Sequence, residues 1–397
     1  MESHKIYEHL LGIPNLRIDK LEEEKKKLIF HCHIESESEP CPSCGKACSS
    51  VNQTTNTKIR DLWISEKEVY LNLSKRQFYC KDCNFYFTER LSWASSCSTY
   101  TNRLAAFIFG INKNQSFYSL AAELNIGCKT LERMFYKRVE SEVNIKENWS
   151  KVRHLGIDEI SNRKGRGNYC CVLTNLETGE EIDILPDRKF ETIQAYFKKL
   201  GLENCPQIEL ICSDMWDAYA NVAKTIFPNA IHVIDRYHVV KSLNEGLDNA
   251  RKEARREMKD CEELKHIKWA LFKRIEDCSE EELIQLDLAF EKAPQLLQAY
   301  LFRNAFNAYM DQAPDALWLE KQLKHWEQLI KLSGLTSYNS FLKTLSNWMH
   351  PIANFAKKRV TNAATEGLNN IIRQVKRMSY GMYNFNNLRL RVLGRNI

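Results

Sequence analysis

The chain has 397 residues, of which 44% are hydrophobic and 27% charged, with a modest net charge of +6, a composition typical of a globular protein with two to four domains. No apolar stretch approaches the ~20 residues of a membrane span, and the first residues, MESHKIYEHL, contain no apolar signal-peptide core. We therefore expect a cytoplasmic protein without membrane contacts. In it, the fourteen cysteines bind metal or stay reduced instead of forming disulfides.

Two pairs of closely spaced cysteines flank a stretch of alternating sequence. Each pair can present two thiolates from a tight turn, and four thiolates form the tetrahedral set that zinc favours. The predicted ligands are Cys41 and Cys44 in CPSCG, and Cys80 and Cys83 in CKDC. We therefore predict one structural Zn²⁺ in a module of short strands over residues 41–90. We interpret the polar residues 1–40 as an N-terminal extension that leads into this module.

A second interpretation of the cysteines stays open, because the 35 residues between the two pairs exceed the most familiar spacing of a zinc ribbon. In it, the cysteines are reduced residues of a core. Cys48, Cys32 and His31 also lie nearby in sequence, but their spacing is less suited to a shared ion, and we expect them not to bind it.

Residues 101–140 have the apolar spacing of two short amphipathic helices, separated at Gly127. One apolar face comprises Phe117, Leu120, Ala121 and Leu124, and the other comprises Leu131, Phe135 and Val139. This pattern favours a helix-turn-helix, although an ordinary helical hairpin fits it too. A second helix starting near Lys129 would present four residues to DNA: Lys129, Thr130, Arg133 and Lys137.

Residues 151–240 contain the alternating patterns of strands and then an alternation of helix and strand. The predicted order is βββαβαβ, which favours a mixed sheet with helices on its faces. The stretches are VRHLGID, NYCCVLTNLETGEEIDIL, FETIQAYFKKLG, IELICSD, Tyr219 to Phe227, and AIHVID.

Two acids close predicted strands of this region: Asp158 ends the first stretch and Asp214 ends IELICSD. Carboxylates at the ends of neighbouring strands converge at one sheet edge, where a divalent cation can offset their repulsion. Either acid alone would more simply face water. A third acid, Glu366, on a helix with basic and amide-rich surroundings favours the metal interpretation.

Between these acids, residues 241–350 have apolar residues at helical spacing and no strand pattern, which predicts an all-helical insertion. Ser279 and Glu282 form a capping box that marks one helix start. The chain then returns to the central domain through residues 351–397, with a helix around TEGLNNIIRQVKR. Its predicted core face is Leu368, Ile371, Ile372 and Val375, and its outer face is Glu366, Asn370, Arg373 and Arg377.

Residues 351–397 carry nine Lys and Arg but only one acid, Glu366. Such a basic end can be a solvated face or a nucleic-acid surface. Three carboxylates suffice to hold two metal ions roughly 3.5–4 Å apart, which activate the attacking oxygen and stabilise the leaving oxygen at a phosphodiester. We therefore predict that Asp158, Asp214 and Glu366 bind two Mg²⁺ (or Mn²⁺) ions per active site. The phosphates beside the scissile bond would contact Arg373, Lys376 and Arg377.

Asp235 and His238 lie three residues apart in VIDRYHVVK, at a predicted helix start. They fit a structural hydrogen-bonded pair. They equally fit a fourth carboxylate near the metals and a histidine that contacts phosphate, and the sequence does not choose among these roles.

Over nearly its whole length the chain resembles the ISL-three-type insertion-sequence transposases of bacteria. The resemblance rests on CPSCG with RQFYCKDCNFYFTER, on GIDE, SDMWDAY and IDRYHVVK, and on TNAATEGLNNIIRQVKRMSYGMYNFNNLRLRVL. It implies a multidomain α+β protein with a zinc ribbon, a helix-turn-helix and a ribonuclease-H-like mixed α/β catalytic domain that contains an all-helical insertion. It also implies a DDE triad of Asp158, Asp214 and Glu366.

The function that this resemblance implies is transposition. The chain would bind double-stranded DNA at the terminal inverted repeats of its element, and then cut and join it to target DNA, as a homodimer or higher oligomer near the nucleoid. A nuclease of the same fold and an inactive or domesticated DNA-binding regulator remain as alternatives. The intact acids argue against the regulator, and the predicted DNA-binding front end argues against a simple nuclease.

Overall fold

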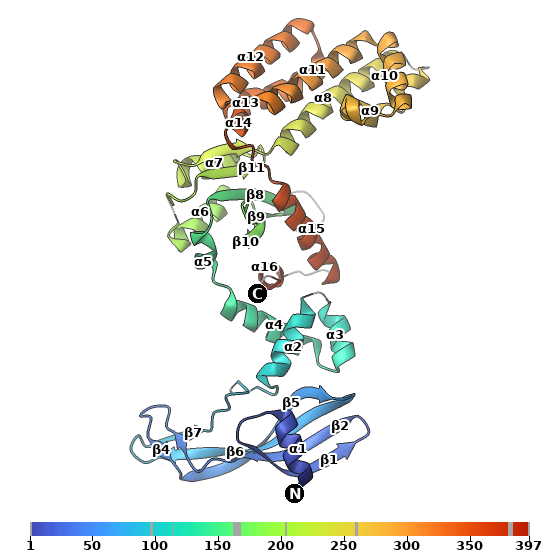
Figure 1. The fold of residues 1–397 in the computed structure, drawn as a ribbon. Coiled ribbons are helices and arrows are strands. Elements are labelled where there is room, and N and C mark those ends of the chain that lie inside the picture. Colours follow the sequence, from blue (N-terminus) through green and yellow to red (C-terminus); the bar gives the residue numbers. More distant parts are fainter. Residues whose placement is uncertain are drawn as a thin grey trace. The chain divides into compact units, whose positions relative to one another are not determined.

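The computed structural model describes residues 2–95, 98–113, 115–161, 168–202, 205–258, 261–379 and 384–395. The chain forms two compact units, Met1–Ser141 and Glu142–Ile397, and each is considered by itself (Figure 1). Among the described helices, none is both long and apolar enough to cross a membrane.

The first unit is built on a sheet with the strand order β1-β2-β6-β5, to which β7 adds beside β6. The elements are α1 (Glu2–Leu11), β1 (Leu16–Glu24), β2 (Lys27–Ile34), β5 (Val51–Ile64), β6 (Lys67–Cys80) and β7 (Phe85–Thr88), with a small pair β3 (Glu39–Pro40) and β4 (Ala47–Cys48). The predicted boundary at residue 40 is wrong. β2 pairs in parallel with β6, and the buried Phe30 and Leu71 share one core, so residues before 40 belong to this sheet.

Three helices follow the sheet in the first unit: α2 (Asn102–Asn112), α3 (Phe117–Leu124) and α4 (Cys128–Glu142). Two of them lie where the apolar spacing predicts helices, and Leu120, Leu131 and Phe135 are buried as expected. The left-handed residue of the turn between α3 and α4 is Asn125, with φ 51°, and not Gly127. The buried Arg60 of β5 donates to the carbonyl oxygens of Leu124 and Asn125, which ties the end of α3 to the sheet.

The second unit begins with α5 (Ile145–Ser150) and then has the predicted order of strands and helices. The elements are β8 (His154–Ser161), β9 (Tyr169–Asn175), β10 (Glu180–Leu185), α6 (Phe190–Leu200), β11 (Leu210–Ser213), α7 (Asp217–Ile226) and β12 (Ile231–Ile234). They form a mixed sheet in the order β10-β9-β8-β11-β12, in which β8, β11 and β12 are parallel. β9 and β10 are antiparallel to their neighbours.

The helices cover both faces of this sheet. Ile157 and Ile211 pack with Phe197 of α6 and with Val222 of α7 on one face. On the other face, Ile160 and Val172 pack against α15 (Ala363–Met378) and α16 (Phe385–Leu393) (Figure 1). Side chains alternate along β8, so Asp158 faces the same side as Ile160, toward α15.

An all-helical region separates β12 from α15. It comprises α8 (Arg236–Glu257), α9 (Lys268–Phe272), α10 (Glu280–Lys292), α11 (Pro294–Gln312), α12 (Ala316–Ser333), α13 (Asn339–Ala353) and α14 (Phe355–Lys358), with 3₁₀ turns at Glu262–Leu264, Ile275–Asp277 and Thr336–Tyr338. The region is therefore wider than residues 241–350, because α8 starts directly after β12. The capping box of Ser279 and Glu282 is confirmed at the start of α10.

α15 approaches the central strand closely at Gly156 of β8. A Cβ atom there would lie 2.8 Å from Asn362 Oδ1 and 2.9 Å from Thr365 Oγ1, so a larger residue would push the helix start away from the strand. On α15, Leu368, Ile372 and Val375 are buried, as predicted. Thr365 and Asn369 are also buried, which the apolar pattern did not indicate.

Candidate active site and zinc centre

Three acids occupy equivalent positions on the three parallel strands. Ile157 of β8 pairs with Ser213 of β11, which pairs with Ile234 of β12. The residue that follows each of these is an aspartate: Asp158, Asp214 and Asp235. Asp214 and Asp235 follow the last residue of their strands as predicted, whereas the prediction that Asp158 ends a strand is wrong. β8 continues to Ser161, and Asp158 pairs with Val172 of β9.

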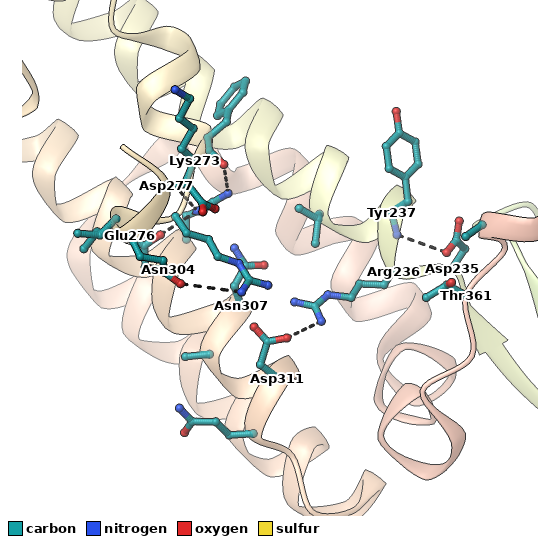
Figure 2. Close-up of a pocket in the computed structure, with 18 of the residues that line it drawn as sticks. Asp235, Arg236, Tyr237, Lys273, Glu276, Asp277, Asn304, Asn307, Asp311 and Thr361 are labelled. Atoms are coloured by element: carbon teal, nitrogen blue, oxygen red, sulfur yellow. Dashed lines mark hydrogen bonds and ion pairs between the residues drawn. The ribbon is translucent and has the colours of Figure 1, made fainter. Parts of the chain in front are cut away.

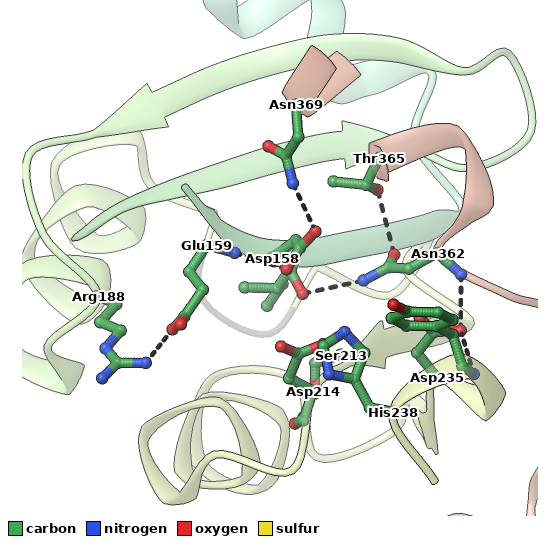
Figure 3. A network of polar contacts seen from close by, with 12 residues as sticks. Asp158, Glu159, Arg188, Ser213, Asp214, Asp235, His238, Asn362, Thr365 and Asn369 are labelled. Atoms are coloured by element: carbon green, nitrogen blue, oxygen red, sulfur yellow. Dashed lines mark hydrogen bonds and ion pairs between the residues drawn. The ribbon is translucent and has the colours of Figure 1, made fainter. Parts of the chain in front are cut away.

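The side chains of Asp158, Asp214 and His238 come together at this row. One ligand atom from each residue lies within 4.8 Å of the other two, and His238 Nε2 is 2.8 Å from Asp214 Oδ1 (Figure 3). The His238 ring therefore contacts the Asp214 carboxylate, whereas its link to Asp235 is a backbone hydrogen bond to the Asp235 carbonyl oxygen. Asp235 Oδ1 instead accepts hydrogen bonds from the backbone N–H of Asn362 (3.2 Å) and of Tyr237 (3.4 Å), at the start of α8.

The crowding of carboxylates changes their protonation. Burial and, after it, the neighbouring Asp214 carboxylate together raise the pKa of Asp158 to about 6. Burial also raises the pKa of Asp235, against the hydrogen bond from Asn362. Burial alone lowers the pKa of His238, but the contact with Asp214 outweighs it, so the net pKa is raised. Without a bound cation, ionising the carboxylates of Asp158 and Asp235 therefore costs free energy.

This donor set fits a hard divalent cation. Carboxylate oxygens are the ligands that Mg²⁺ prefers, and a bound cation would offset the repulsion between Asp158 and Asp214. Asp214 Oδ1 is buried 2.8 Å from His238 Nε2, so a bound ion and the imidazole would share this carboxylate. The Oδ2 atom of Asp158, by contrast, accepts a hydrogen bond from a side chain of α15.

Residues of α15 and its N-terminus hold Asp158 and its strand in place. Asn369 Nδ2 donates to Asp158 Oδ2 at 2.7 Å, and Asn362 Nδ2 donates to the carbonyl oxygen of Ile157 at 3.1 Å (Figure 3). Thr365 Oγ1 donates to Asn362 Oδ1 at 3.1 Å. We predicted none of these three roles from the sequence. Their signal is the spacing of Asn362, Thr365 and Asn369, which places them on one helical face between apolar positions.

Glu366 does not join the cluster of Asp158, Asp214 and His238. It is exposed in the first turn of α15, and it lines a cleft of about 820 Å³ together with Asp235. Helical geometry puts it one turn from Asn362 and Asn369, at the border of the face that contacts the acids. The structure thus brings two of the three predicted acids together and leaves the third at the adjoining cleft.

The predicted phosphate-binding cations on α15 differ in their environment. Arg373 and Arg377 are exposed, as their helical face predicts. Lys376 is half-buried, donates to the carbonyl oxygen of Ser161 at the end of β8, and burial lowers its pKa. Lys376 therefore has a structural contact that the sequence pattern did not indicate.

A second feature beside the acids is a cation–π stack. Arg188 forms an ion pair with Glu159 (Figure 3). Its guanidinium lies 4.0 Å from the centre of the Trp216 ring and 4.5 Å from that of Tyr169. Trp216 lies two residues after Asp214 and stays 41% exposed. The stack fixes the loop that carries Asp214 against the strand that carries Asp158.

The four predicted zinc ligands form one cluster in the first unit. Sulfur atoms of Cys41, Cys44, Cys80 and Cys83 all lie within 4.8 Å of one another. Cys41 follows β3, Cys80 ends β6, and Gly45, with φ 75°, closes the turn of the first pair. A backbone hydrogen bond from Cys83 lowers the pKa of Cys80 to about 6, which favours the thiolate that zinc binds.

Of the nearby spare residues, Cys48 packs beside this cluster with Phe78 and Phe87, outside the group of four. Cys32 lies in the separate core of β2 and donates to the carbonyl oxygen of Asn72, and His31 contacts Glu22. The geometry of the four thiols therefore fits one tetrahedral ion.

Two family models match the chain, one in each unit. A family model of ISL3 DDE transposases, described as "Transposase", matches residues 155–392. A second model, described as the zinc-finger of transposase IS204/IS1001/IS1096/IS1165, matches residues 37–83. A similar curated protein is the transposase for insertion sequence element IS1001 of Bordetella parapertussis, 27% identical over 86% of this chain and 84% of that protein. The transposase for element IS1557 of Mycobacterium tuberculosis is 26% identical over 59% of this chain and 58% of its own.

The zinc site predicts the effect of removing one thiol. The variant Cys80→Ser should lose the metal and increase amide hydrogen exchange near residues 37–88, while the second unit stays folded, because a small module of this kind depends on its ion. Cys205→Ser, a half-buried cysteine of the second unit, is the control and should keep the metal. Elemental analysis and hydrogen exchange measure both. Wild-type protein without zinc would contradict the prediction.

The crowded acids predict a pH-dependent gain of stability in Asp158→Asn. The folded-state pKa of about 6 lies above the pKa of 3.8 that an unfolded aspartate has, so the protonated form stabilises the fold fully below pH ~3.8, and this contribution is lost as pH rises through about 6. Without metal, the variant should therefore gain up to ~3 kcal/mol in free energy of unfolding near pH 7.5, and little near pH 4.

Urea unfolding at the two pH values measures this difference, with the exposed Asp287→Asn on α10 as the control. Added Mg²⁺ should stabilise the wild type more than Asp158→Asn, because the ion binds only the folded carboxylates. A variant that is less stable than wild type near neutral pH would contradict the repulsion between Asp158 and Asp214.

Proposed function

We infer the function from the premise that the chain belongs to the ISL3 family of transposases, whose model matches more than half of it. It is an insertion-sequence transposase. We propose that it cuts DNA at the ends of its element and joins them to a target by a two-metal reaction, with Asp158, Asp214 and Glu366 as the metal ligands. The observation that carries the proposal is the row of carboxylates on adjacent parallel strands.

The architecture of the second unit supports this chemistry. The strand order β10-β9-β8-β11-β12, with three antiparallel strands and two further parallel ones, is what a ribonuclease-H-like domain requires. We propose that fold for the second unit, with the helical region between β12 and α15 as its insertion. Two Mg²⁺ ions bound there would supply the activation of the attacking oxygen and the stabilisation of the leaving oxygen.

The residues around the acids have separate tasks in this proposal. Asp158 and Asp214 bind the cations directly. Asn369 holds Asp158 through its amide, and His238 holds Asp214, so that both carboxylates keep their positions as charge is neutralised. Asp235 orders the junction of β12, α8 and Asn362, and serves as an auxiliary acid beside the metals.

Glu366 completes the set from α15 in this proposal. It borders the cleft that Asp235 also lines, and a change of its side-chain rotamer together with a small shift of the first turn of α15 would bring it to the ions. Arg373 and Arg377 then lie on the exposed side of the same helix, where they would contact phosphates beside the scissile bond.

The first unit would recognise the ends of the element. We propose that α3 and α4 form a helix-turn-helix and that α4 enters the major groove. Lys129, Arg133 and Lys137 are exposed on α4 and Thr130 is partly exposed, opposite the buried Leu131 and Phe135. The zinc ribbon would add a second DNA contact. The homodimer or higher oligomer that joins two ends, and the cytoplasmic, nucleoid-associated location, stay predictions.

The alternatives differ in measurable ways. A nuclease of the same fold would cut but not join the ends, and a regulator would bind the ends without cutting them. The buried, crowded acids favour catalysis, because an inert domain gains nothing from a carboxylate row that raises the pKa of Asp158.

The catalytic proposal predicts that Asp158→Asn and Glu366→Gln abolish Mg²⁺-dependent cleavage and strand transfer, by at least a hundredfold, while DNA binding stays intact. Both variants remove a charge at nearly constant volume. Oligonucleotides with the inverted repeats that flank the gene are the substrates, and Glu177→Gln, on an exposed turn of the same unit, is the control. If Glu366→Gln cuts at the wild-type rate, another residue is the third ligand.

The placement of α4 predicts that the double variant Arg133→Ala and Lys137→Ala weakens binding to the element's ends by about ten- to a hundredfold, since a base contact contributes ~1–3 kcal/mol. The control is Lys198→Ala with Lys199→Ala, two exposed cations on α6. Titrations at several salt concentrations separate base contacts from phosphate contacts. Equal affinity of the two double variants would exclude α4 as the recognition helix.

A further inference from the structure

A cleft of about 820 Å³ opens between the acids and the helical region (Figure 2). Asp235 and Glu366 line its end at the sheet, and Asn304, Asn307 and Gln312 of α11 line the other wall. The volume is large enough for a small organic group. Of the predicted triad, Glu366 lines this cleft, whereas Asp158 and Asp214 do not.

The charges on the cleft wall do not suit a run of phosphates. Three of the four lining cations are engaged within the chain: Arg236 pairs with Asp311 at 2.5 Å, Lys273 pairs with Glu282 at 2.6 Å, and Arg303 donates to the carbonyl oxygens of Phe272 and Lys273. The fourth, Arg274, is exposed and lies 3.9 Å from Glu276. Five acids accompany these four cations in the lining, so the cleft has no excess of positive charge. An occupant that is polar and uncharged therefore fits better than a DNA backbone.

The wall does offer what a nucleobase needs. Tyr237 lines the cleft two residues after Asp235, is 57% exposed, and its ring packs edge-on against the His238 ring. Asn307 of α11 lines the cleft as well, and its Oδ1 is buried without a hydrogen-bond partner among the described residues. Every nucleobase carries an N–H donor on its Watson–Crick edge and a face that stacks on an aromatic ring.

We propose that this cleft receives one unstacked base of the DNA strand whose phosphate lies at Asp158 and Asp214. The base stacks on Tyr237 and donates to Asn307 Oδ1. The inference rests on the proposed function, because it needs a DNA strand at the acids. Stacking contributes ~1–3 kcal/mol per base, which offsets the few kcal/mol that unstacking costs, so the capture holds the strand in position for the reaction.

The test uses duplexes with the inverted repeat that flanks the gene, in which 2-aminopurine replaces one nucleotide at a time around the cleavage position. Ca²⁺ replaces Mg²⁺, so that the full chain binds the strand without cutting it. At one position, fluorescence should rise several-fold on binding to the wild type, since unstacking removes the quenching by neighbouring bases. Tyr237→Ala should lose this rise, and Tyr237→Phe should keep it.

A second measurement shows whether the ring meets a base. Tyr237→Ala should weaken binding of the intact duplex about tenfold. It should not weaken binding of a duplex with an abasic site at the position where the 2-aminopurine fluorescence rises. Asn307→Ala should show the same dependence on the base. Trp269→Ala, an exposed aromatic of α9 outside the cleft lining, is the control and should bind both duplexes as the wild type does.

Cleavage by the wild type in Mg²⁺ is measured in parallel, so that a failure of the base capture can be told apart from a failure of the proposed function. If the wild type cuts but the 2-aminopurine fluorescence rises at no position, the cleft holds no base and the transposase function stands. The same conclusion follows if Tyr237→Ala weakens binding of intact and abasic duplexes equally. If the wild type neither binds nor cuts the repeats, both the proposed function and the base capture are overturned.

Discussion

The parallel register of β8, β11 and β12 is the constraint on which the second unit depends. Because Ile157, Ser213 and Ile234 are level across the sheet, the next residue of each strand is level too, and all three are aspartates. The backbones of these residues cannot move apart without breaking hydrogen bonds between the strands. The surrounding contacts follow from this crowding: an amide donor from α15 to Asp158 and an imidazole from α8 beside Asp214.

A long helical region interrupts the second unit between β12 and α15. The region from α8 to α14 has a core around Trp326, Phe306 and Tyr338, and this core continues to Leu210 of β11 and Val233 of β12. Loop-closure entropy grows slowly with length, so returning the chain costs little. The return is then secured by specific contacts, in which Asn362 reaches Ile157 and Arg389 of α16 reaches Asp183 of β10, each across more than two hundred residues.

Patterns that repeat locally could be predicted from the sequence, whereas partners that meet only in space could not. Paired cysteines and the strand–helix alternation are local, and the cysteine cluster and the order βββαβαβ are confirmed. The end of β8 was placed too early because Asp158 looked like a strand terminator, although Glu159 and Ile160 continue the pairing with β9. The strands before residue 40 were missed because their charged outer faces hide an alternating core of Leu28, Phe30 and Cys32. The spacing of Asn369 places it on a helical face with Thr365, but it does not identify its partner, which is 211 residues away.

The contact between Asn369 and Asp158 also has a consequence for the order in which the protein becomes complete during translation. At ~5–20 residues per second, the 211 residues between them take about 10–40 s to synthesise. The unit Met1–Ser141 has its own core, so it can fold and take up zinc during that interval. A nascent chain that has emerged as far as α14 thus has the aspartate row but neither Glu366 nor the amides that order it. The time needed to synthesise the rest of the chain therefore separates the folding of the first unit from the assembly of the acid site.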